Sequence, residues 1–456
     1  MILTFPRVLA LATLLAGSTL AQTVPDGEYR DFKGSNGVVI QAVLLDKTPS
    51  EAVLLLRTGK RSTIPLNRLS AEDQAYVAAW SKDKAVFVQK CRGLAIRQLL
   101  ELRGYESFEF RLENNSILID GKLNGKPARF LVDTGAGTSL LHAPFATSVG
   151  LEVGPMTEKI YGVSGEAPAG WTPVPSIQLG EAVFKDRRIL ATDLLKDRPP
   201  GARSREDTIL GADFMNKLDA VISYQDRRIF LRPDRSDQSE IKPSGGEDSL
   251  AFRLFKTKEG KTLRGKVVAK TPTSVTIELV DGKKSIIFIS NFVPEDEAYL
   301  KAWSEAGAFF LQHCQSLTIH ELLTLRKYQS FQFERRGNHI FVNGTLNDNK
   351  VTYMIDTGAD SSLLHVNAAK KYGCEVGPMT ETVWGIGGKA PAGVTNIVKL
   401  TMGEAVLTNR KVLATDMHRG DDDDNMDYVG LFGADFMREL DAVITYTENR
   451  IFLIQR

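Results

Sequence analysis

One stretch of twelve residues occurs twice in this chain of 456 residues, at 130–141 and again at 353–364. In each copy an apolar run is followed by Asp-Thr-Gly, beginning at Asp133 and at Asp356, and then by further apolar residues. This pattern indicates a buried strand that ends in a tight turn. The two aspartates lie 223 positions apart, and the same offset relates tryptophan, cysteine and methionine residues along the whole chain. The chain is therefore a tandem duplication, and its fold must contain two copies of one unit.

The first 21 residues have the pattern of a secretory signal peptide. A positive charge at Arg7 precedes a short apolar run, and the small residues Thr19 and Ala21 are spaced for cleavage before Gln22. A buried N-terminal helix or a membrane anchor is the alternative, but the apolar run is short for a span of about 20 residues. We therefore expect an exported protein of the periplasm, cell envelope or extracellular space, with no membrane span after signal removal.

The charge and cysteine content argue against a nucleic-acid-binding protein and against a small protein held together by disulfides. Loss of Arg7 with the signal reduces the 57 Lys and Arg residues to 56, which balance the 56 Asp and Glu residues. A chain without net charge lacks the basic footprint of a nucleic-acid binder. Three cysteines are too few for a disulfide framework. Buried free thiols are expected, and a bridge between Cys91 and Cys314 in an oxidising compartment is the alternative.

Each repeat begins with a strand-rich segment that ends in a short helix. In the first copy Ser70 precedes an acid three positions later, which is typical of a helix N-terminus. In the second copy Asp281 and Gly282 indicate a hairpin, and Pro294 opens the helix. These patterns predict two small barrels, each closed by a helix. A helical segment then follows at 85–103 and its copy at 308–326.

The layout of the small barrels resembles the Sla-type homology domain of endocytic adaptors, a Src-homology-3-like barrel. The resemblance implies that each barrel binds a short peptide motif. A rigid spacer, or a packing partner for the neighbouring domain, is an equally good interpretation. The predicted segments of the chain are a signal peptide at 1–21, a small barrel at 22–83, a lobe at 84–233, a linker at 234–248, a second small barrel at 249–307 and a second lobe at 308–456.

A glycine-rich hairpin follows the Asp-Thr-Gly stretch in both repeats. An aromatic residue followed by several glycines suits a mobile flap that closes over a substrate, because glycine lets the backbone approach a ligand closely. An ordinary surface hairpin has the same composition. The candidate flap and substrate-binding residues are Tyr161, Gly162, Gly165, Trp384, Gly385 and Gly388.

Toward the end of each repeat, two apolar residues precede a glycine, Gly211 or Gly433, which follows the aspartate by 78 or 77 positions. The Asp-Thr-Gly turn, the hairpin and this glycine, in this order, resemble the retropepsin-like aspartic peptidases over about 107–231 and 330–454. The resemblance implies a mainly β fold. It would consist of two retropepsin-like closed β-barrel lobes of the acid protease type, alternating with the two small Src-homology-3-like barrels and joined by short helices.

The chemistry of peptide hydrolysis explains why two aspartates are present. One ionised carboxylate must take a proton from water while a protonated one polarises the scissile carbonyl. Two carboxylates about 3 Å apart repel by roughly 5 kcal/mol at an effective dielectric of about 20, so the pair holds one shared proton. The resemblance implies that Asp133 and Asp356 are this catalytic pair and that four neighbours support it: Thr134 and Thr357 by hydrogen bonds across the junction, Gly135 and Gly358 by permitting the turn.

The loop before the terminal glycine differs most between the repeats. It is basic at 196–205 and acidic at 418–424. Opposite charges could help the two halves to recognise each other, and the acidic run could bind a cation. Solvated loops are favoured, since the acidic run lacks the glycine and the distal glutamate of a calcium loop.

Two functions remain open from the sequence. The first is an exported aspartic endopeptidase that acts on polypeptides without metal or cofactor, as a monomer with an internal pair of aspartates or as a homodimer. The second is a non-catalytic peptide-binding or scaffold protein of the cell envelope. The two intact aspartates favour the enzyme.

Overall fold

The computed structural model describes residues 29–162, 165–195, 205–232, 252–385, 388–403, 405–417 and 428–454. The chain divides into two compact units, 1–85 and 86–456. The predicted signal peptide and linker, the acidic run and most of the basic loop lie outside the described residues. Within the described ranges, no helix is long and apolar enough to cross a membrane.

The first unit contains one four-stranded antiparallel sheet, in the order β1-β2-β3-β4, and a helix. Phe32, Leu54 and Val77 are fully buried in its core. Ser70 caps the helix, because its hydroxyl accepts a hydrogen bond from the backbone N–H of Asp73 at 3.2 Å. The elements are β1 (Arg30–Lys33), β2 (Val39–Lys47), β3 (Glu51–Leu56), β4 (Arg61–Pro65), the 3₁₀ turn η1 (Leu66–Arg68), α1 (Ala71–Ala79) and α2 (Lys82–Val86), which reaches the end of the unit.

The second small sheet repeats this arrangement in the order β16-β17-β18-β19. Arg253 pairs with the buried Asp296 at 2.8 Å, as Arg30 pairs with Asp73 in the first copy. The strand orders give two antiparallel sheets with a covering helix, and the likeness to Src-homology-3 barrels stays a prediction. The elements are β16 (Arg253–Lys256), β17 (Thr262–Lys270), β18 (Ser274–Leu279), β19 (Lys284–Phe288), η3 (Ile289–Asn291) and α6 (Pro294–Ala302).

Each predicted helical segment is broken into shorter helices. In the second copy Thr318 has an extended backbone, and its hydroxyl accepts from the N–H of Glu321 at 3.1 Å, so a new helix begins there. Cys91 and Cys314 are buried in one apolar cluster between these helices, and no disulfide joins them. The elements are the π-helical turn η2 (Phe87–Cys91), α3 (Ile96–Glu101), α7 (Glu305–His313) and α8 (Ile319–Leu325).

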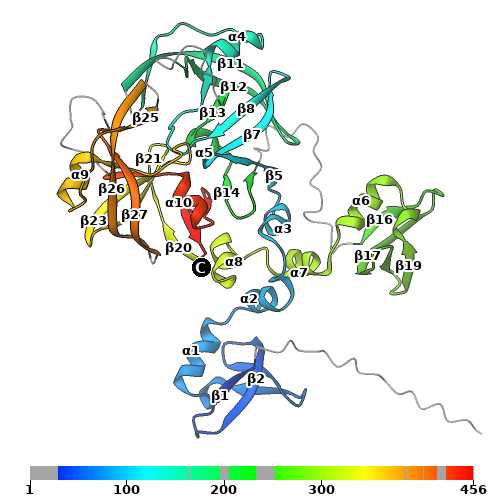
Figure 1. Ribbon diagram of the computed structural model, residues 1–456. Coiled ribbons are helices and arrows are strands. Elements are labelled where there is room, and N and C mark those ends of the chain that lie inside the picture. The colour runs from blue at the N-terminus through cyan, green and yellow to red at the C-terminus, as the bar shows by residue number, and fades with distance from the viewer. Residues whose placement is uncertain are drawn as a thin grey trace, which may run out of the picture. The chain divides into compact units, whose positions relative to one another are not determined.

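The first lobe is built on an eight-stranded mixed sheet, drawn from cyan to green in Figure 1. Its order is β10-β11-β12-β9-β13-β8-β7-β6, with β11 also pairing with β7. The elements are β6 (Arg111–Glu113), β7 (Ser116–Leu123), β8 (Lys126–Val132), β9 (Leu140–His142), α4 (Ala143–Ser148), β10 (Glu158–Gly162), β11 (Gly165–Leu179), β12 (Ala182–Thr192), β13 (Thr208–Leu210) and α5 (Ala212–Lys217).

The second lobe has the same topology, drawn from yellow to red in Figure 1. Its sheet has the order β21-β22-β23-β28-β24-β27-β26-β25, with β22 also pairing with β26. The elements are β21 (Glu334–Arg336), β22 (His339–Leu346), β23 (Asn349–Ile355), β24 (Leu363–His365), α9 (Val366–Lys371), β25 (Glu381–Gly385), β26 (Gly388–Met402), β27 (Ala405–Thr415), β28 (Gly430–Phe432) and α10 (Ala434–Glu439).

A six-stranded sheet joins the two lobes, which belong to the same compact unit. Its order is β20-β30-β29-β14-β15-β5, and β14 of the first lobe pairs antiparallel with β29 of the second, with Ile222 opposite Ile444. One apolar core runs through both lobes. The strands are β5 (Glu106–Glu109), β14 (Val221–Ser223), β15 (Arg228–Leu231), β20 (Gln329–Gln332), β29 (Val443–Thr445) and β30 (Arg450–Leu453).

Candidate active site

The two Asp-Thr-Gly turns follow the buried strands β8 and β23. The backbone N–H of Asp133 donates to the carbonyl of Leu210 at 3.0 Å, and that of Asp356 donates to Phe432 at 2.9 Å. The preceding residues Val132 and Ile355 are fully buried. The strands therefore carry the two aspartates to matching positions, where the lobes meet.

Thr134 and Thr357 form a symmetric hydrogen-bond network across this junction. The backbone N–H of each threonine donates to the hydroxyl of the other at 3.1 Å. The hydroxyl of Thr134 donates to the carbonyl of Ile355 at 2.8 Å, and that of Thr357 donates to the carbonyl of Val132 at 2.9 Å. Both side chains are fully buried, so these groups have no water to replace a lost partner.

The carboxyl group of each aspartate lies directly against the glycine of the opposite turn. A Cβ atom added at Gly135 would stand 2.4 Å from the carboxyl carbon of Asp356, and one added at Gly358 would stand 2.3 Å from that of Asp133. The carboxyl groups of Asp133 and Asp356 are themselves hydrogen-bonded to each other. Only glycine leaves room for this close approach of the two carboxyl groups.

Backbone donors hold both carboxyl groups in the same way. Oδ1 of Asp133 accepts from the N–H of Gly135 at 2.8 Å and from that of Ala136 at 3.0 Å. Oδ1 of Asp356 accepts from Gly358 and Ala359, both at 3.0 Å. Each carboxyl group therefore has one oxygen fixed by its own turn.

Burial raises the pKa of both carboxyl groups. For Asp133, the charge of Asp356 and the hydrogen bond between them raise the pKa further, well above the usual range. For Asp356, burial is opposed by the hydrogen bond with Asp133, by the N–H groups of Ala359 and Gly358 and by nearby His339, which all lower its pKa. The two carboxyl groups therefore titrate as one coupled pair, and the raised pKa values favour a shared proton on the pair.

Gly211 and Gly433 lie against the Asp-Thr-Gly turns. A Cβ atom at Gly211 would stand 2.7 Å from the carbonyl oxygen of Ala136, and one at Gly433 would stand 2.8 Å from that of Ala359. The backbone of each turn is therefore packed against the start of the following helix, α5 or α10.

A serine and an aspartate in each lobe tie these elements together, and sequence reasoning missed them. Ser139 donates to Asp213 at 2.7 Å and accepts from the N–H of Gly211 at 3.0 Å. Ser362 donates to Asp435 at 2.7 Å and accepts from the N–H of Gly433 at 2.9 Å. The sequence signal that could have identified them is that the serine and the aspartate both recur at equivalent positions in the two repeats.

The glycine-rich stretches form the predicted hairpins, β10–β11 and β25–β26. Gly162 pairs with Gly165 and Gly385 with Gly388, while the two residues at each tip lie outside the described residues. Gly165 has φ of 137° and Gly388 of 125°, which favours glycine at both positions. The aromatic residues of the hairpins are exposed, Tyr161 by 69% and Trp384 by 39%. They are available to a ligand rather than buried in a core.

The repeated histidines begin helices. His142 accepts from the N–H of Leu194 at 3.2 Å, and the buried His365 lies 3.3 Å from the carboxylate of Asp416. The described part of the chain contains no group of three or more His, Cys, Asp or Glu side chains that could hold a metal ion.

Two regions of the chain, 119–214 and 342–436, match the model of the aspartyl protease family. Each repeat is thus similar to the aspartyl protease family over these residues. Each region contains one Asp-Thr-Gly turn, one hairpin and one terminal glycine, so the predicted resemblance is confirmed for both repeats. No curated protein sequence matches the chain.

Solved structures of aspartic proteases are also similar to this chain. A retropepsin-like aspartic protease from Rickettsia conorii is 19% identical, and the match covers 28% of this chain and 92% of that protein, with a TM-score of 0.21. The aspartic proteinase from Irpex lacteus is 11% identical, and the match covers 77% of this chain and 97% of that protein, with a TM-score of 0.36. The predicted fold class is confirmed by the chain's own topology, because the described residues are mainly β and form two lobes, each built on an eight-stranded mixed sheet.

Proposed function

We propose that this chain is an exported aspartic endopeptidase in which Asp133 and Asp356 form one catalytic dyad between the two repeats. The observation that carries the proposal is the contact of each carboxyl group with the glycine of the opposite turn. Two buried carboxyl groups that lie next to each other share one proton over a wide pH range. They therefore supply an acid and a base at the same place and time.

The coupled pair supplies both roles. The ionised carboxylate takes a proton from a water molecule that attacks the scissile carbonyl carbon. The protonated carboxyl donates its proton to the carbonyl oxygen and stabilises the tetrahedral intermediate. Collapse of the intermediate breaks the C–N bond: the proton taken from water passes to the departing amine, and one hydroxyl proton of the intermediate returns to the carboxylate that had protonated the carbonyl oxygen. The products are a carboxylic acid and an amine, so water is the only co-reactant.

The surrounding residues restrict the motion of the dyad. The threonine network fixes the two turns relative to each other, and the backbone N–H groups fix one oxygen of each carboxyl. In the proposal, the hairpins that carry Tyr161 and Trp384 close over a polypeptide substrate. Their exposed aromatic side chains support this role.

Export and the role of the small sheets are proposals that rest on the sequence. Export follows from the signal-like residues 1–21, and peptide binding by 22–83 and 249–307 follows from the resemblance to adaptor barrels. Immunoblotting of cell fractions with an antibody to this chain tests export. A chain found intact in the cytosol, with residues 1–21 still attached, would contradict it.

The function is tested by incubating the mature chain with denatured casein from pH 3 to 8, with and without pepstatin. The proposal predicts cleavage that pepstatin blocks and that declines as the pH rises and the pair loses its shared proton. A folded chain that cuts nothing at any pH would favour the alternative, a peptide-binding or scaffold protein.

A further inference from the structure

The second small sheet exposes apolar side chains on a strand at its edge. β19 is the last strand in the order β16-β17-β18-β19, and within the described residues it pairs only with β18 (Figure 1). Ile286 is 77% exposed and Phe288 is 62% exposed. The two side chains lie two positions apart and therefore on the same face of the strand. Neighbouring exposed apolar side chains of this kind are typical of an interaction site.

The backbone of β19 is open on the same edge. At one end of the strand the N–H of Ile289 donates to the carbonyl of Thr273 at 2.9 Å. At the other end the N–H of Leu279 donates to the carbonyl of Lys283 at 2.8 Å. Backbone groups in an antiparallel pair alternate between the two sides of a strand. The odd-numbered residues from 283 to 289 therefore face β18, and the N–H groups of the even-numbered residues between them face the open edge.

The equivalent edge of the first small sheet is closed. β4 is the edge strand there, and the hydrogen bonds at its two ends match those of β19. The offset of 223 positions aligns Thr63 with Ile286 and Pro65 with Phe288. Proline has no N–H to donate, and proline is one of the residues that protect edge strands from pairing. The duplication therefore contains one protected edge and one edge that is open and apolar.

We propose that the β19 edge binds an extended segment of an unfolded polypeptide, which adds to the four-stranded sheet as a further antiparallel strand. The open N–H groups select a ligand in strand conformation, because carbonyl groups at the same spacing must meet them. Ile286 and Phe288 select apolar side chains at alternate positions of this segment.

The charge beside the apolar pair adds a preference. Lys284 is exposed on the same face of β19, two residues before Ile286. The acid opposite it in the sheet, Glu278, pairs with Lys266 at 3.0 Å. The cation of Lys284 therefore favours a ligand that carries an acidic residue next to its apolar residues.

This inference deepens the proposed function, because an unfolded polypeptide is the substrate of the proposed endopeptidase and would gain a second contact with the chain. The identity of the ligand as substrate rests on the proposed function. The binding itself does not, since β19 contributes no residue to the pair of aspartates. A chain that binds the peptide and cleaves nothing would contradict the proposed function alone.

Two substitutions give β19 the residues of the first sheet. Phe288→Pro removes an N–H and an aromatic ring from the edge, and Ile286→Thr removes apolar surface. Phe288 has φ of −67° and Pro65 of −57°, so proline fits this position without a change of the backbone. Leu254→Asp is the matched control. Leu254 is 63% exposed on the opposite edge strand, β16, and aligns with Asp31 of the first sheet.

The probe is a short fluorescent peptide in which valine alternates with threonine after a leading glutamate. Fluorescence anisotropy follows its titration with the full chain. We expect saturable binding to the native chain, about tenfold weaker binding to Phe288→Pro and about fivefold weaker binding to Ile286→Thr. Leu254→Asp should bind as the native chain does. N-methylation of the valines should abolish binding and N-methylation of the threonines should not, because the valine N–H groups face β19 in an antiparallel strand.

Circular dichroism verifies that each variant is folded. Absence of saturable binding to the native chain, equal affinity of the Phe288→Pro variant, or equal binding of the two methylated peptides would overturn the proposal. Sedimentation tests the other occupant of the edge, a second copy of this chain. We expect a monomer for the native chain and for Phe288→Pro. A native dimer that Phe288→Pro converts to a monomer would mean that the edge pairs with itself, and would also overturn the proposal.

Discussion

The backbone N–H of Thr134 donates to the hydroxyl of Thr357, and that of Thr357 donates to the hydroxyl of Thr134, each at 3.1 Å. The two residues lie 223 positions apart and both are fully buried. This exchange links the two active-site turns through four hydrogen bonds when the carbonyls of Val132 and Ile355 are included. Each turn is therefore held by the other.

Thr134→Val should destabilise the chain by about 1 to 3 kcal/mol. Valine keeps the shape of threonine, but the N–H of Thr357 and the carbonyl of Ile355 would remain buried without partners. Urea unfolding measures the change. Thr147→Val is the control, because the hydroxyl of Thr147 donates to Ala143 on an exposed helix. Equal stability of the two variants would contradict the role of the network.

Gly135→Ala should reduce the rate of casein cleavage on the order of 100-fold, because a displacement of about 1 Å in a catalytic group has this effect. The added methyl would stand 2.4 Å from the carboxyl carbon of Asp356 and would push it from its place. Gly93→Ala is the control, since an added Cβ there meets nothing within 4 Å. Circular dichroism verifies that both variants are folded, and a fully active Gly135→Ala variant would exclude the close pair of carboxyls.

Asp133→Asn should change how stability depends on pH. The pKa of Asp133 is raised on folding, so its favourable contribution is complete below the unfolded pKa of about 3.9 and is lost as the pH rises toward the folded value. Asparagine does not ionise, so the variant should gain stability relative to the native chain as the pH increases above about 4. Denaturant unfolding at several pH values measures the difference.

The exposed Asp120→Asn variant is the control for this comparison, because Asp120 lies on the surface and pairs only with Arg111 in the described contacts. Its stability curve should run nearly parallel to that of the native chain. A parallel curve for Asp133→Asn as well would contradict the raised pKa of Asp133.

Ser139→Ala should lower the free energy of unfolding by about 1 to 3 kcal/mol and should also lower the cleavage activity. It leaves the N–H of Gly211 and the carboxylate of Asp213 without the partner that joins them to the first turn. Ser148→Ala is the control, because the hydroxyl of Ser148 caps an exposed carbonyl in α4. If both variants unfold at the same urea concentration, the hydrogen bonds of Ser139 do not stabilise the fold.

Much of the site could be predicted from the sequence because its parts are local. The Asp-Thr-Gly turns depend on short runs of residues that occur twice, and the glycines are required by close packing that any sequence of this fold must satisfy. The capping box at Thr318 and the cap at Ser70 were visible for the same reason. The breaks in the helical segments were missed, because apolar spacing continues through them.

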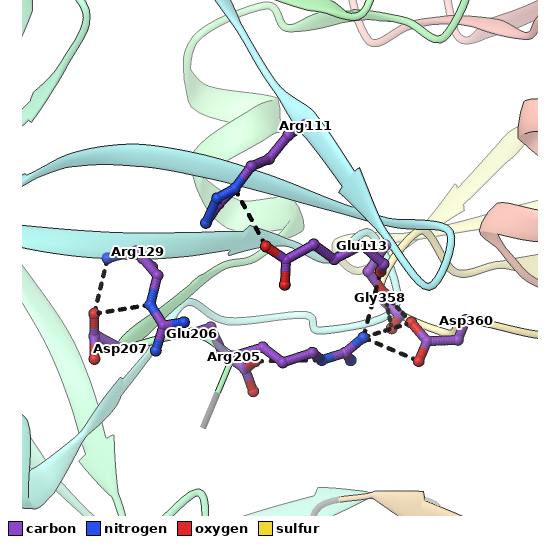
Figure 2. A network of polar contacts seen from close by, with 9 residues as sticks. Arg111, Glu113, Arg129, Arg205, Glu206, Asp207, Gly358 and Asp360 are labelled. Atoms are coloured by element: carbon purple, nitrogen blue, oxygen red, sulfur yellow. Dashed lines mark hydrogen bonds and ion pairs between the residues drawn. The ribbon is translucent and has the colours of Figure 1, made fainter. Parts of the chain in front are cut away.

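Contacts between the lobes were harder to predict. Arg205 and Asp360, which form an ion pair between the lobes (Figure 2), lie 155 positions apart, and Arg205 belongs to the loop that differs most between the repeats. The opposite charges of the two loops hinted that the halves recognise each other, but no sequence pattern could name the partners. The serine that joins each turn to the following helix was also missed, since its partner is 74 positions away in the first lobe.

The central claim is that one Asp133 and one Asp356 form a single site in each chain. The most direct measurement is the casein-cleaving activity of the Asp133→Asn and Asp356→Asn variants, each assayed alone beside the native chain. We predict that either substitution alone removes at least about 99% of the activity, because each leaves the dyad without its partner. If one variant keeps half or more of the native rate, the two aspartates do not share a site, and pairing between like lobes would take its place.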